Sequence, residues 1–184
     1  LSELFAPDFV RITLGGLAMA IVALLMWWSC NAFISLVATG LAQTHGTAVG
    51  LDAPAVAGLV AEWKRTANYY FNLGGLIGTL LTVPIAKLAG RRVMFGLYFA
   101  ASAAAILCAF GIDMAPETRL VMYFPIGVSV FGVFGSFTYY LPELYPTRLR
   151  GTGSGFCYNA GRVIAAFGPW LVASIASRGT DAFE

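Results

Sequence analysis

Long apolar runs, uncharged except for Arg162 in the last of them, are separated by short segments in which the other charged residues gather. The runs cover about residues 12–43, 66–86, 93–112, 120–142 and 151–177. Each can cross a membrane as a helix, because a hydrocarbon core about 30 Å thick needs about 20 apolar helical residues. Membrane-spanning strands would be only about 9–11 residues long and would alternate in polarity, which these runs do not. The pattern therefore predicts an all-α membrane protein with five transmembrane helices.

The composition agrees with a membrane protein. Hydrophobic residues make up 59% of the chain and charged residues only 11%, whereas an ordinary soluble domain has about 25% charged residues. So few charges exclude a soluble or disordered chain and a nucleic-acid-binding protein, and the net charge of +2 identifies no partner. Cys30, Cys108 and Cys157 lie far apart inside apolar runs. We expect them to be small buried hydrophobic side chains, not disulfides or metal ligands.

The basic residues predict how the helices are oriented. Lys87, Arg91 and Arg92 lie in a short linker without an acid, and Arg148 and Arg150 lie in the other short linker. Short loops rich in Lys and Arg stay in the cytoplasm. Both linkers and the N-terminus are therefore predicted to be cytoplasmic, in a multi-pass protein of the plasma or inner membrane.

The opposite side of the membrane carries the longest predicted connection. Residues 46–60 are rich in small residues, and we expect a flexible external loop there. His45 precedes this loop and has no acid or cysteine at metal-ligand spacing. A structural or solvent-exposed role is favoured for it, with proton handling as the alternative.

Polar residues recur at helical spacing on four of the five predicted helices. The stripes are Asn31, Ser35 and Thr39; Asn68, Asn72, Gly75, Thr79 and Thr82; Ser129, Gly132, Ser136 and Tyr140; and Gly155, Asn159, Arg162 and Ala166. Small residues on such faces are explained by helix packing, but Asn and Arg are harder to explain in that way. The third helix has no stripe. This pattern favours a polar interior with the third helix on the lipid side.

Arg162 is the most informative single residue. It lies near the middle of the fifth run, with Tyr158 one turn before it and Asn159 on the same line. An arginine at that depth costs about 2.5–3.5 kcal/mol on insertion scales, so another group must compensate the charge. Backbone carbonyls or water would make the role structural, and an anionic ligand would make it functional. The residues leave both interpretations open.

A second group of charges lies at the predicted cytoplasmic helix ends. Glu143, Arg148 and Arg150 follow the fourth helix, and Arg91 and Arg92 begin the third. A carboxylate can accept paired hydrogen bonds from guanidinium groups, so this cluster is a candidate lock between helix ends. Ordinary anchoring at the membrane surface would explain the arginines but not Glu143.

Three motifs resemble one transporter family. Residues 142–153, which read PELYPTRLRGTG, resemble the segment between helices ten and eleven of the major facilitator superfamily. The similarity is greatest to its branch of sugar porters, metabolite–proton symporters and organic ion transporters. Gly90-Arg91-Arg92 resembles the end of that family's linker between helices eight and nine. Gly161-Arg162 with Gly168-Pro169 resembles a pattern of its eleventh helix.

The resemblance implies that residues 1–184 are a truncated C-terminal transmembrane domain, helices seven to eleven of twelve, whose partner is the N-terminal half. It implies that Glu143 forms an intracellular salt-bridge network with Arg91, Arg92 and Arg150. It also implies that Asn31, Asn72 and Arg162 line or lie near a central cavity. Lys87 stands where the family usually has an acid, which separates this linker from the family pattern. The paired glutamines of sugar porters are absent from the first helix, which disfavours a sugar substrate.

Together these features predict part of a secondary active transporter that works by alternating access. The buried positive charge favours a small carboxylate-bearing metabolite, with proton symport. An organic cation transporter of the same fold is the nearest alternative, and a five-helix membrane scaffold is the next. An enzyme is disfavoured because the helices offer no nucleophile–base pair or set of metal ligands. No cofactor is expected.

Overall fold

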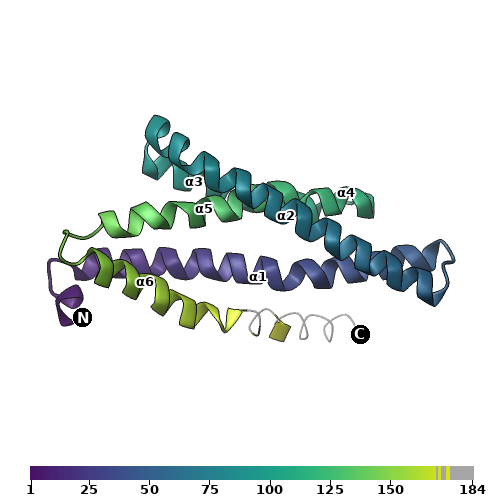
Figure 1. The fold of residues 1–184 in the computed structure, drawn as a ribbon, viewed down its shortest axis with the longest axis horizontal. Helices are drawn as coiled ribbons and strands as arrows, with labels where there is room; N and C mark the ends of the chain where they lie inside the picture. The colour runs from purple at the N-terminus through teal and green to yellow at the C-terminus, as the bar shows by residue number, and fades with distance from the viewer. Residues whose placement is uncertain (169, 171–172, 175–184) are drawn as a thin grey trace. The chain divides into compact units, whose positions relative to one another are not determined.

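Every regular element in the computed structural model is a helix within the residues that it describes, which are 1–168, 170 and 173–174. The elements follow one another along the chain, and Figure 1 labels the α-helices among them. They are the 3₁₀-helix η1 (Ser2–Phe5) and the α-helices α1 (Val10–Ala48), α2 (Ala53–Ala89), α3 (Arg91–Gly111), α4 (Pro116–Val121), α5 (Tyr123–Glu143) and α6 (Arg150–Ala165).

Four helical segments are long and apolar enough to cross a membrane by length and composition. They are Val10–Ala48, Ala53–Ala89, Arg91–Gly111 and Pro116–Glu143, the last of which combines α4 and α5. The first four predicted spans are thus confirmed as helices. The fifth span, 151–177, begins with α6, but residues 169, 171–172 and 175–177 lie outside the described part of the chain. The count of five membrane helices stays a prediction.

The prediction of a flexible loop over residues 46–60 is wrong. Helix α1 continues to Ala48 and α2 already begins at Ala53. The carboxylate of Asp52 accepts a hydrogen bond of 3.0 Å from the backbone N–H of Ala55, which caps the new helix. Small residues suggested flexibility, but alanine is the strongest helix former, and Pro54 is tolerated because it lies in the first turn.

The chain divides into two compact units. Unit 1 consists of Leu1–Cys30 and Phe137–Glu184, and unit 2 consists of Asn31–Ser136. Helices α1 and α5 pass from one unit into the other. Each unit is described by itself below.

Glycines bring α2 and α5 into direct backbone contact in unit 2. A Cβ atom on Gly74 would overlap the carbonyl oxygen of Phe124, and one on Gly78 would overlap that of Val128. From the other helix, a Cβ on Gly127 would overlap the carbonyl oxygen of Phe71. Such close approach is how small residues drive helix association inside a membrane. The glycines that the predicted stripes place on these two helices, Gly75 and Gly132, instead face the rings of Phe131 and Tyr98. The backbone contact at the α2–α5 crossing is thus made by glycines that the stripes do not contain.

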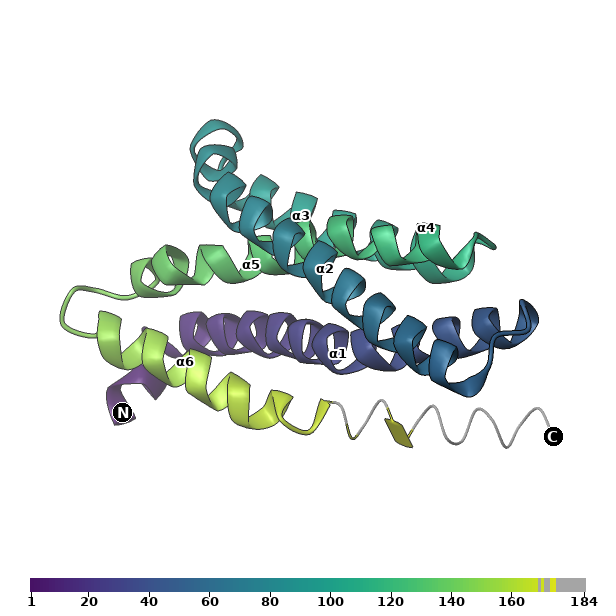
Figure 2. The ribbon, with the colours of Figure 1, turned by 45° about the vertical axis from the view of Figure 1, so that its right-hand side comes forward.

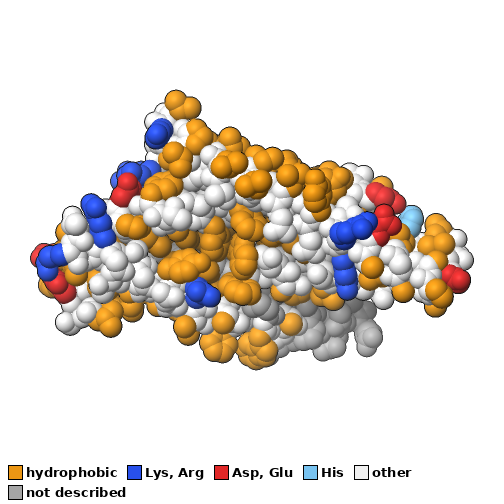
Figure 3. Space-filling view, in the orientation of Figure 1, with side chains coloured by type: hydrophobic (Ala, Val, Ile, Leu, Met, Phe, Trp, Pro, Cys, Tyr) orange, Lys and Arg blue, Asp and Glu red, His pale blue; other side chains and the backbone are white. Residues whose placement is uncertain are grey.

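Helix α3 lies against this crossing with one face only. Gly90 joins α2 to α3 with a φ of 84°, a conformation that favours glycine. Tyr98 and Ser102 are only 5% and 2% exposed, whereas Leu107 on the same helix is 70% exposed. Helix α2 likewise presents Leu76 and Leu80 outward, and Figure 3 shows hydrophobic side chains along it. The outer faces of α2 and α3 are therefore suited to a lipid environment.

His45, near the end of α1, has two neighbours in unit 2. Its Nε2 atom lies 3.8 Å from a carboxylate oxygen of Glu117 on α4. Its ring also lies against Trp63 of α2, with 5.4 Å between the ring centres. Trp63 is buried, whereas the side chains of His45 and Glu117 are partly exposed. These contacts support the structural role that was favoured for His45.

In unit 1, α6 packs along the first part of α1 through small residues (Figure 2). A Cβ on Gly16 of α1 would lie 3.3 Å from the sulfur of Cys157. A Cβ on Gly161 of α6 would lie 3.2 Å from Ala20. Cys157 is fully buried in this interface, as predicted, whereas Cys30 and Cys108 are only partly buried. The close contact fixes which face of α6 points away from α1.

Candidate functional site

Helix α6 has one packed face and one polar face. Gly153, Cys157, Gly161 and Ala165 recur every four residues and are buried. The line predicted to be functional lies on another side, where Asn159, Arg162 and Ala166 are exposed within the described chain. The small-residue face is used for packing on α1, so the polar face is left to contact something else.

The guanidinium group of Arg162 lies over an aromatic ring of its own helix. Its central carbon is 5.8 Å from the centre of the Tyr158 ring, within the range of a cation–π contact. No carboxylate among residues 1–168, 170 and 173–174 pairs with Arg162. The amide nitrogen of Asn159, one turn away, donates a hydrogen bond of 2.8 Å to the carbonyl oxygen of Gly155. The Tyr158 ring thus stabilises the positive charge of Arg162 in part, but no carboxylate in the described residues neutralises it.

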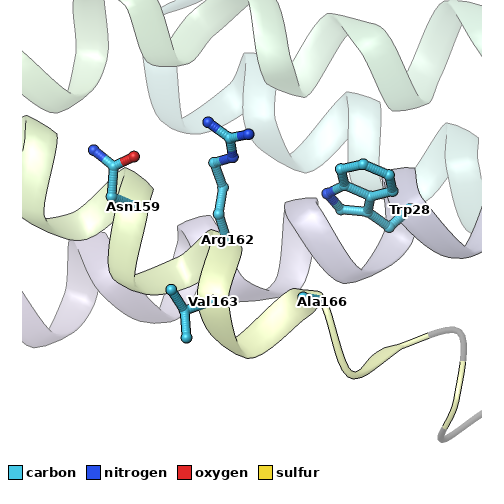
Figure 4. A pocket seen from close by; sticks show the side chains of 5 residues that line it. All are labelled: Trp28, Asn159, Arg162, Val163 and Ala166. Carbon is cyan, nitrogen blue, oxygen red and sulfur yellow. The ribbon is translucent and has the colours of Figure 1, made fainter.

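A cavity of about 520 Å³ opens beside Arg162 within unit 1. Ligand pockets typically enclose about 300–1,000 Å³, so this volume suits a small molecule. Figure 4 shows Asn159 and Arg162 reaching from α6 and the indole of Trp28 reaching from α1. The lining residues are Trp28, Asn159, Arg162, Val163 and Ala166. The cavity therefore combines one cation and one amide with an aromatic and apolar wall.

The predicted cavity residues divide between the two units. Tyr158, Asn159 and Arg162 lie together on α6, and two of them line the cavity. Asn31 and Asn72 belong to unit 2 and are not among the residues that line the unit 1 cavity. The amide nitrogen of Asn72 donates a hydrogen bond of 2.8 Å to the carbonyl oxygen of Asn68. Their part in a shared site stays a prediction.

The predicted cytoplasmic cluster occupies helix ends. Glu143 is the last residue of α5 and Arg150 is the first of α6, both in unit 1. The Nε atom of Arg150 donates a hydrogen bond of 3.4 Å to the carbonyl oxygen of Tyr145. Arg148 pairs with Glu3 of η1, an acid that the sequence did not single out. In unit 2, Arg91 and Arg92 are the first two residues of α3.

Three residues of these sites were missed by reasoning from the sequence: Trp28 and Val163, which line the cavity, and Glu3, which pairs with Arg148. Trp28 belongs to an apolar run. Its position next to Trp27 and before the polar stripe that begins at Asn31 is the only sequence signal that it has. The ring centres of the two tryptophans are 5.0 Å apart. Glu3 lies in the short segment before the first predicted helix, where the sequence shows no motif. Pairing between residues 145 positions apart, such as Glu3 and Arg148, has no local sequence signal.

The chain is similar to proteins named as transporters. NiaP of Bacillus subtilis (strain 168), named as a candidate niacin/nicotinamide transporter, is 32% identical over 108 residues, which are 58% of this chain and 26% of NiaP. The candidate transporter svop-1 of Caenorhabditis elegans is 28% identical over 189 residues, covering 96% of this chain and 34% of svop-1. Human solute carrier family 22 member 11 is 29% identical over 124 residues, covering 64% of this chain and 22% of that protein.

These relatives are membrane transport proteins, and the chain spans about a quarter to a third of the length of the first relatives. They are transporters of the major facilitator type and confirm the resemblance of the chain to part of that superfamily. They also confirm the prediction that the chain is not an enzyme. No family model and no solved structure matches the chain.

Proposed function

We propose that the chain is the C-terminal half, without its last helix, of a major facilitator transporter that moves a small carboxylate-bearing metabolite by alternating access. The observation that carries this proposal is Arg162, which reaches into the α6 cavity without a carboxylate partner in the described residues. The five predicted spans would be helices seven to eleven of the complete protein.

The chemistry of the cavity favours an anion. A guanidinium group in a membrane span is costly unless it is paired, and its planar fork of N–H donors matches a carboxylate in two parallel hydrogen bonds. A bound carboxylate would therefore neutralise Arg162 and recover that cost. The adjacent wall of Trp28 and Val163 would accept an apolar or aromatic body. NiaP is named for niacin, a pyridine carboxylate that fits this description, and also for nicotinamide, the neutral amide, so its name alone does not favour the carboxylate.

The helix-end charges support a cytoplasmic gate. The C-terminal end of a helix is negative and the N-terminal end is positive. Glu143 at the end of α5, and Arg150, Arg91 and Arg92 at the start of their helices, all lie at ends where the helix dipole disfavours their charge. We propose that these residues and Arg148 form a network that holds the cytoplasmic side closed and releases when it opens, since mutual pairing would offset the unfavourable placement.

The remaining parts of the proposal concern the whole protein. The transporter would lie in the plasma or inner membrane, and the N-terminus of this chain would lie on its cytoplasmic side. Uptake is coupled to a proton, and the titrating carboxylate belongs to the N-terminal half, because the predicted spans of this chain contain neither Asp nor Glu within them.

The test compares two probes that differ in charge but hardly in shape. The full-length protein is reconstituted in liposomes, and uptake of nicotinate is measured against uptake of nicotinamide, the neutral amide. Nicotinate is expected to enter at least about tenfold faster, the factor that corresponds to one charge-assisted hydrogen bond. An inward proton gradient should accelerate its entry, and dissipating that gradient should remove the acceleration.

Variants identify the residue responsible. Arg162→Gln should abolish the preference for nicotinate, and Arg162→Lys should restore part of it. Arg65→Gln is the matched control, because it removes one positive charge from the exposed face of α2 and should change neither probe. Equal uptake of nicotinate by Arg162→Gln and wild type would overturn the anion site. Entry of tetraethylammonium with no entry of any carboxylate would favour the cation transporter instead.

A further inference from the structure

A buried polar node ties four separate segments of unit 1 together. The hydroxyl of Thr13 donates a hydrogen bond of 2.9 Å to the carbonyl oxygen of Leu4 in η1. The hydroxyl of Tyr145 donates one of 3.1 Å to the hydroxyl oxygen of Thr13, and it lies 3.3 Å from the sulfur of Cys157 on α6. All four residues are at most 2% exposed. The node therefore joins η1, α1, the α5–α6 linker and α6.

The direction of the hydrogen bonds follows from the groups themselves. A carbonyl oxygen can only accept, so the single hydroxyl proton of Thr13 is committed to Leu4. Thr13 must then accept from Tyr145, which has the only other hydroxyl proton in the node. The Cys157 thiol completes the set with a contact of 3.5 Å to the carbonyl oxygen of Thr13. Thr13 is thus the central member, and losing either hydroxyl interrupts the chain.

The same segments are joined again at the periphery of the node. Arg148 of the linker pairs with Glu3 of η1. The ring of Phe5 in η1 meets that of Phe156 on α6 edge to face, with 5.4 Å between centres. Gly153 leaves room for Tyr145, because a Cβ there would lie 2.5 Å from the Cε2 atom of the tyrosine ring. Helix η1 is thus held by a buried hydrogen bond to α1, an ion pair with the α5–α6 linker and an aromatic contact with α6.

We propose that Thr13 and Tyr145 form a clamp that fixes η1 to the α5–α6 linker and thereby positions the proposed gate residues. Glu143 lies two residues before Tyr145, and Arg150 donates a hydrogen bond to the Tyr145 carbonyl oxygen. The two ends of one residue thus hold the linker: its side chain is bound to α1 and its backbone to Arg150. Movement of η1 would pass to the gate through this residue. Thr13 and Tyr145 are positioning residues, and the second part of this inference rests on the proposed gate.

Hydrogen exchange of the full-length protein in detergent tests the clamp without measuring transport. Tyr145→Phe removes one hydroxyl and keeps the ring, and Thr13→Val removes the other hydroxyl at similar volume. Each should accelerate amide exchange in residues 2–9 and 144–150 by about three- to tenfold, the factor given by one buried hydrogen bond. The double variant should add little to either single one, because both interrupt the same chain.

Tyr98→Phe is the matched control, since it also deletes a buried tyrosine hydroxyl but in unit 2. It should accelerate exchange in α2 and α3 and leave residues 2–9 unchanged. Unchanged exchange in Tyr145→Phe, or equal acceleration over residues 2–9 and 91–111, would overturn the clamp.

A second comparison separates positioning of the gate from simple stabilisation. Glu143→Gln should accelerate exchange of the linker by a smaller factor in the Tyr145→Phe background than in wild type. The reason is that Tyr145→Phe already moves the Glu143 carboxylate away from the arginines, so removing its charge breaks fewer contacts. The same factor in both backgrounds would mean that the clamp does not position the gate. A full-length protein that takes up no nicotinate would count against the proposed function alone, since the exchange factors do not depend on transport.

Discussion

The hydroxyl group of Tyr98 on α3 donates a hydrogen bond of 2.8 Å to the carbonyl oxygen of Gly78 on α2. The same ring covers Gly132 of α5, where a Cβ would overlap it. The Tyr98 side chain of α3 thus contacts both α2 and α5 where these three helices of unit 2 meet. The close α2–α5 crossing leaves no room for a side chain at Gly78, because a Cβ there would overlap the carbonyl oxygen of Val128.

Removing this hydroxyl should loosen unit 2. Tyr98→Phe is expected to lower the free energy of unfolding by about 0.5–1.5 kcal/mol, the net value of one hydrogen bond. The measurement is thermal or denaturant unfolding of the purified protein in detergent. Tyr69→Phe serves as the control, because that side chain is 61% exposed. An equal loss in both variants would show that the bond to Gly78 contributes nothing specific.

Adding a single methyl group at the helix crossing should be more damaging. Gly78→Ala places a Cβ on the carbonyl oxygen of Val128, so the two backbones must separate at the cost of about 1–3 kcal/mol or more. Gly96→Ala adds the same methyl group where no atom lies within 4 Å, and it should be neutral or slightly stabilising because alanine favours helix. The two variants are compared by thermal unfolding, and similar midpoints would contradict the close crossing.

The apolar runs predicted the helices well, because the thickness of the membrane sets the length of an apolar helix that crosses it. The runs at 93–112 and 120–142 match α3 and α5 closely. The signal fails where helices project beyond the membrane: α1 and α2 have 39 and 37 residues, and their ends are not marked by hydropathy. The start of α2 is marked instead by the cap at Asp52 and by Pro54 in its first turn, two local signals that an expectation of a loop over residues 46–60 does not use.

The site was only partly accessible to the sequence. Spacing along one helix placed Tyr158, Asn159 and Arg162 together correctly, because helical geometry fixes neighbours three and four residues apart. Trp28 could not be assigned to the same cavity, because the register between α1 and α6 depends on packing at Gly16 and Gly161. The sequence marks these glycines as small but does not say which of them meet.

The buried hydroxyl of Tyr145 predicts a pH dependence of stability. Burial and the hydrogen bond shared with Cys157 raise its pKa to about 12 from the model-compound value of 10.0. Above pH 10 the unfolded chain releases this proton while the folded chain still holds it. Stability is therefore fully present below pH 10 and falls as the pH rises toward 12, by at most about 3 kcal/mol.

The measurement is the difference in free energy of unfolding between wild type and Tyr145→Phe from pH 9 to 11.5. The advantage of wild type should shrink as the pH rises, because phenylalanine has no proton to lose. Tyr69→Phe, at an exposed position, should differ from wild type by a constant amount. A constant difference for Tyr145→Phe as well would mean that its hydroxyl is solvated.

Loss of the carboxylate at the end of α5 should open the proposed cytoplasmic gate. Glu143→Gln keeps the shape of the side chain but removes the charge that would attract the arginines, so the equilibrium should shift toward the inward-open state by about tenfold. The shift is read from a cysteine placed at Val163, which lines the α6 cavity, in a full-length background without Cys30 and Cys108. Labelling by an impermeant maleimide from the cytoplasmic side should accelerate, and nicotinate uptake should fall.

Glu62→Gln is the matched control for this experiment. It removes an exposed carboxylate from the first part of α2 and should leave both labelling and uptake unchanged. Because a gate acts on both faces, labelling of the Val163 cysteine from the outside should slow in Glu143→Gln while labelling from the cytoplasm accelerates. Acceleration from both sides would indicate general loosening, and no change from either side would remove Glu143 from the gate.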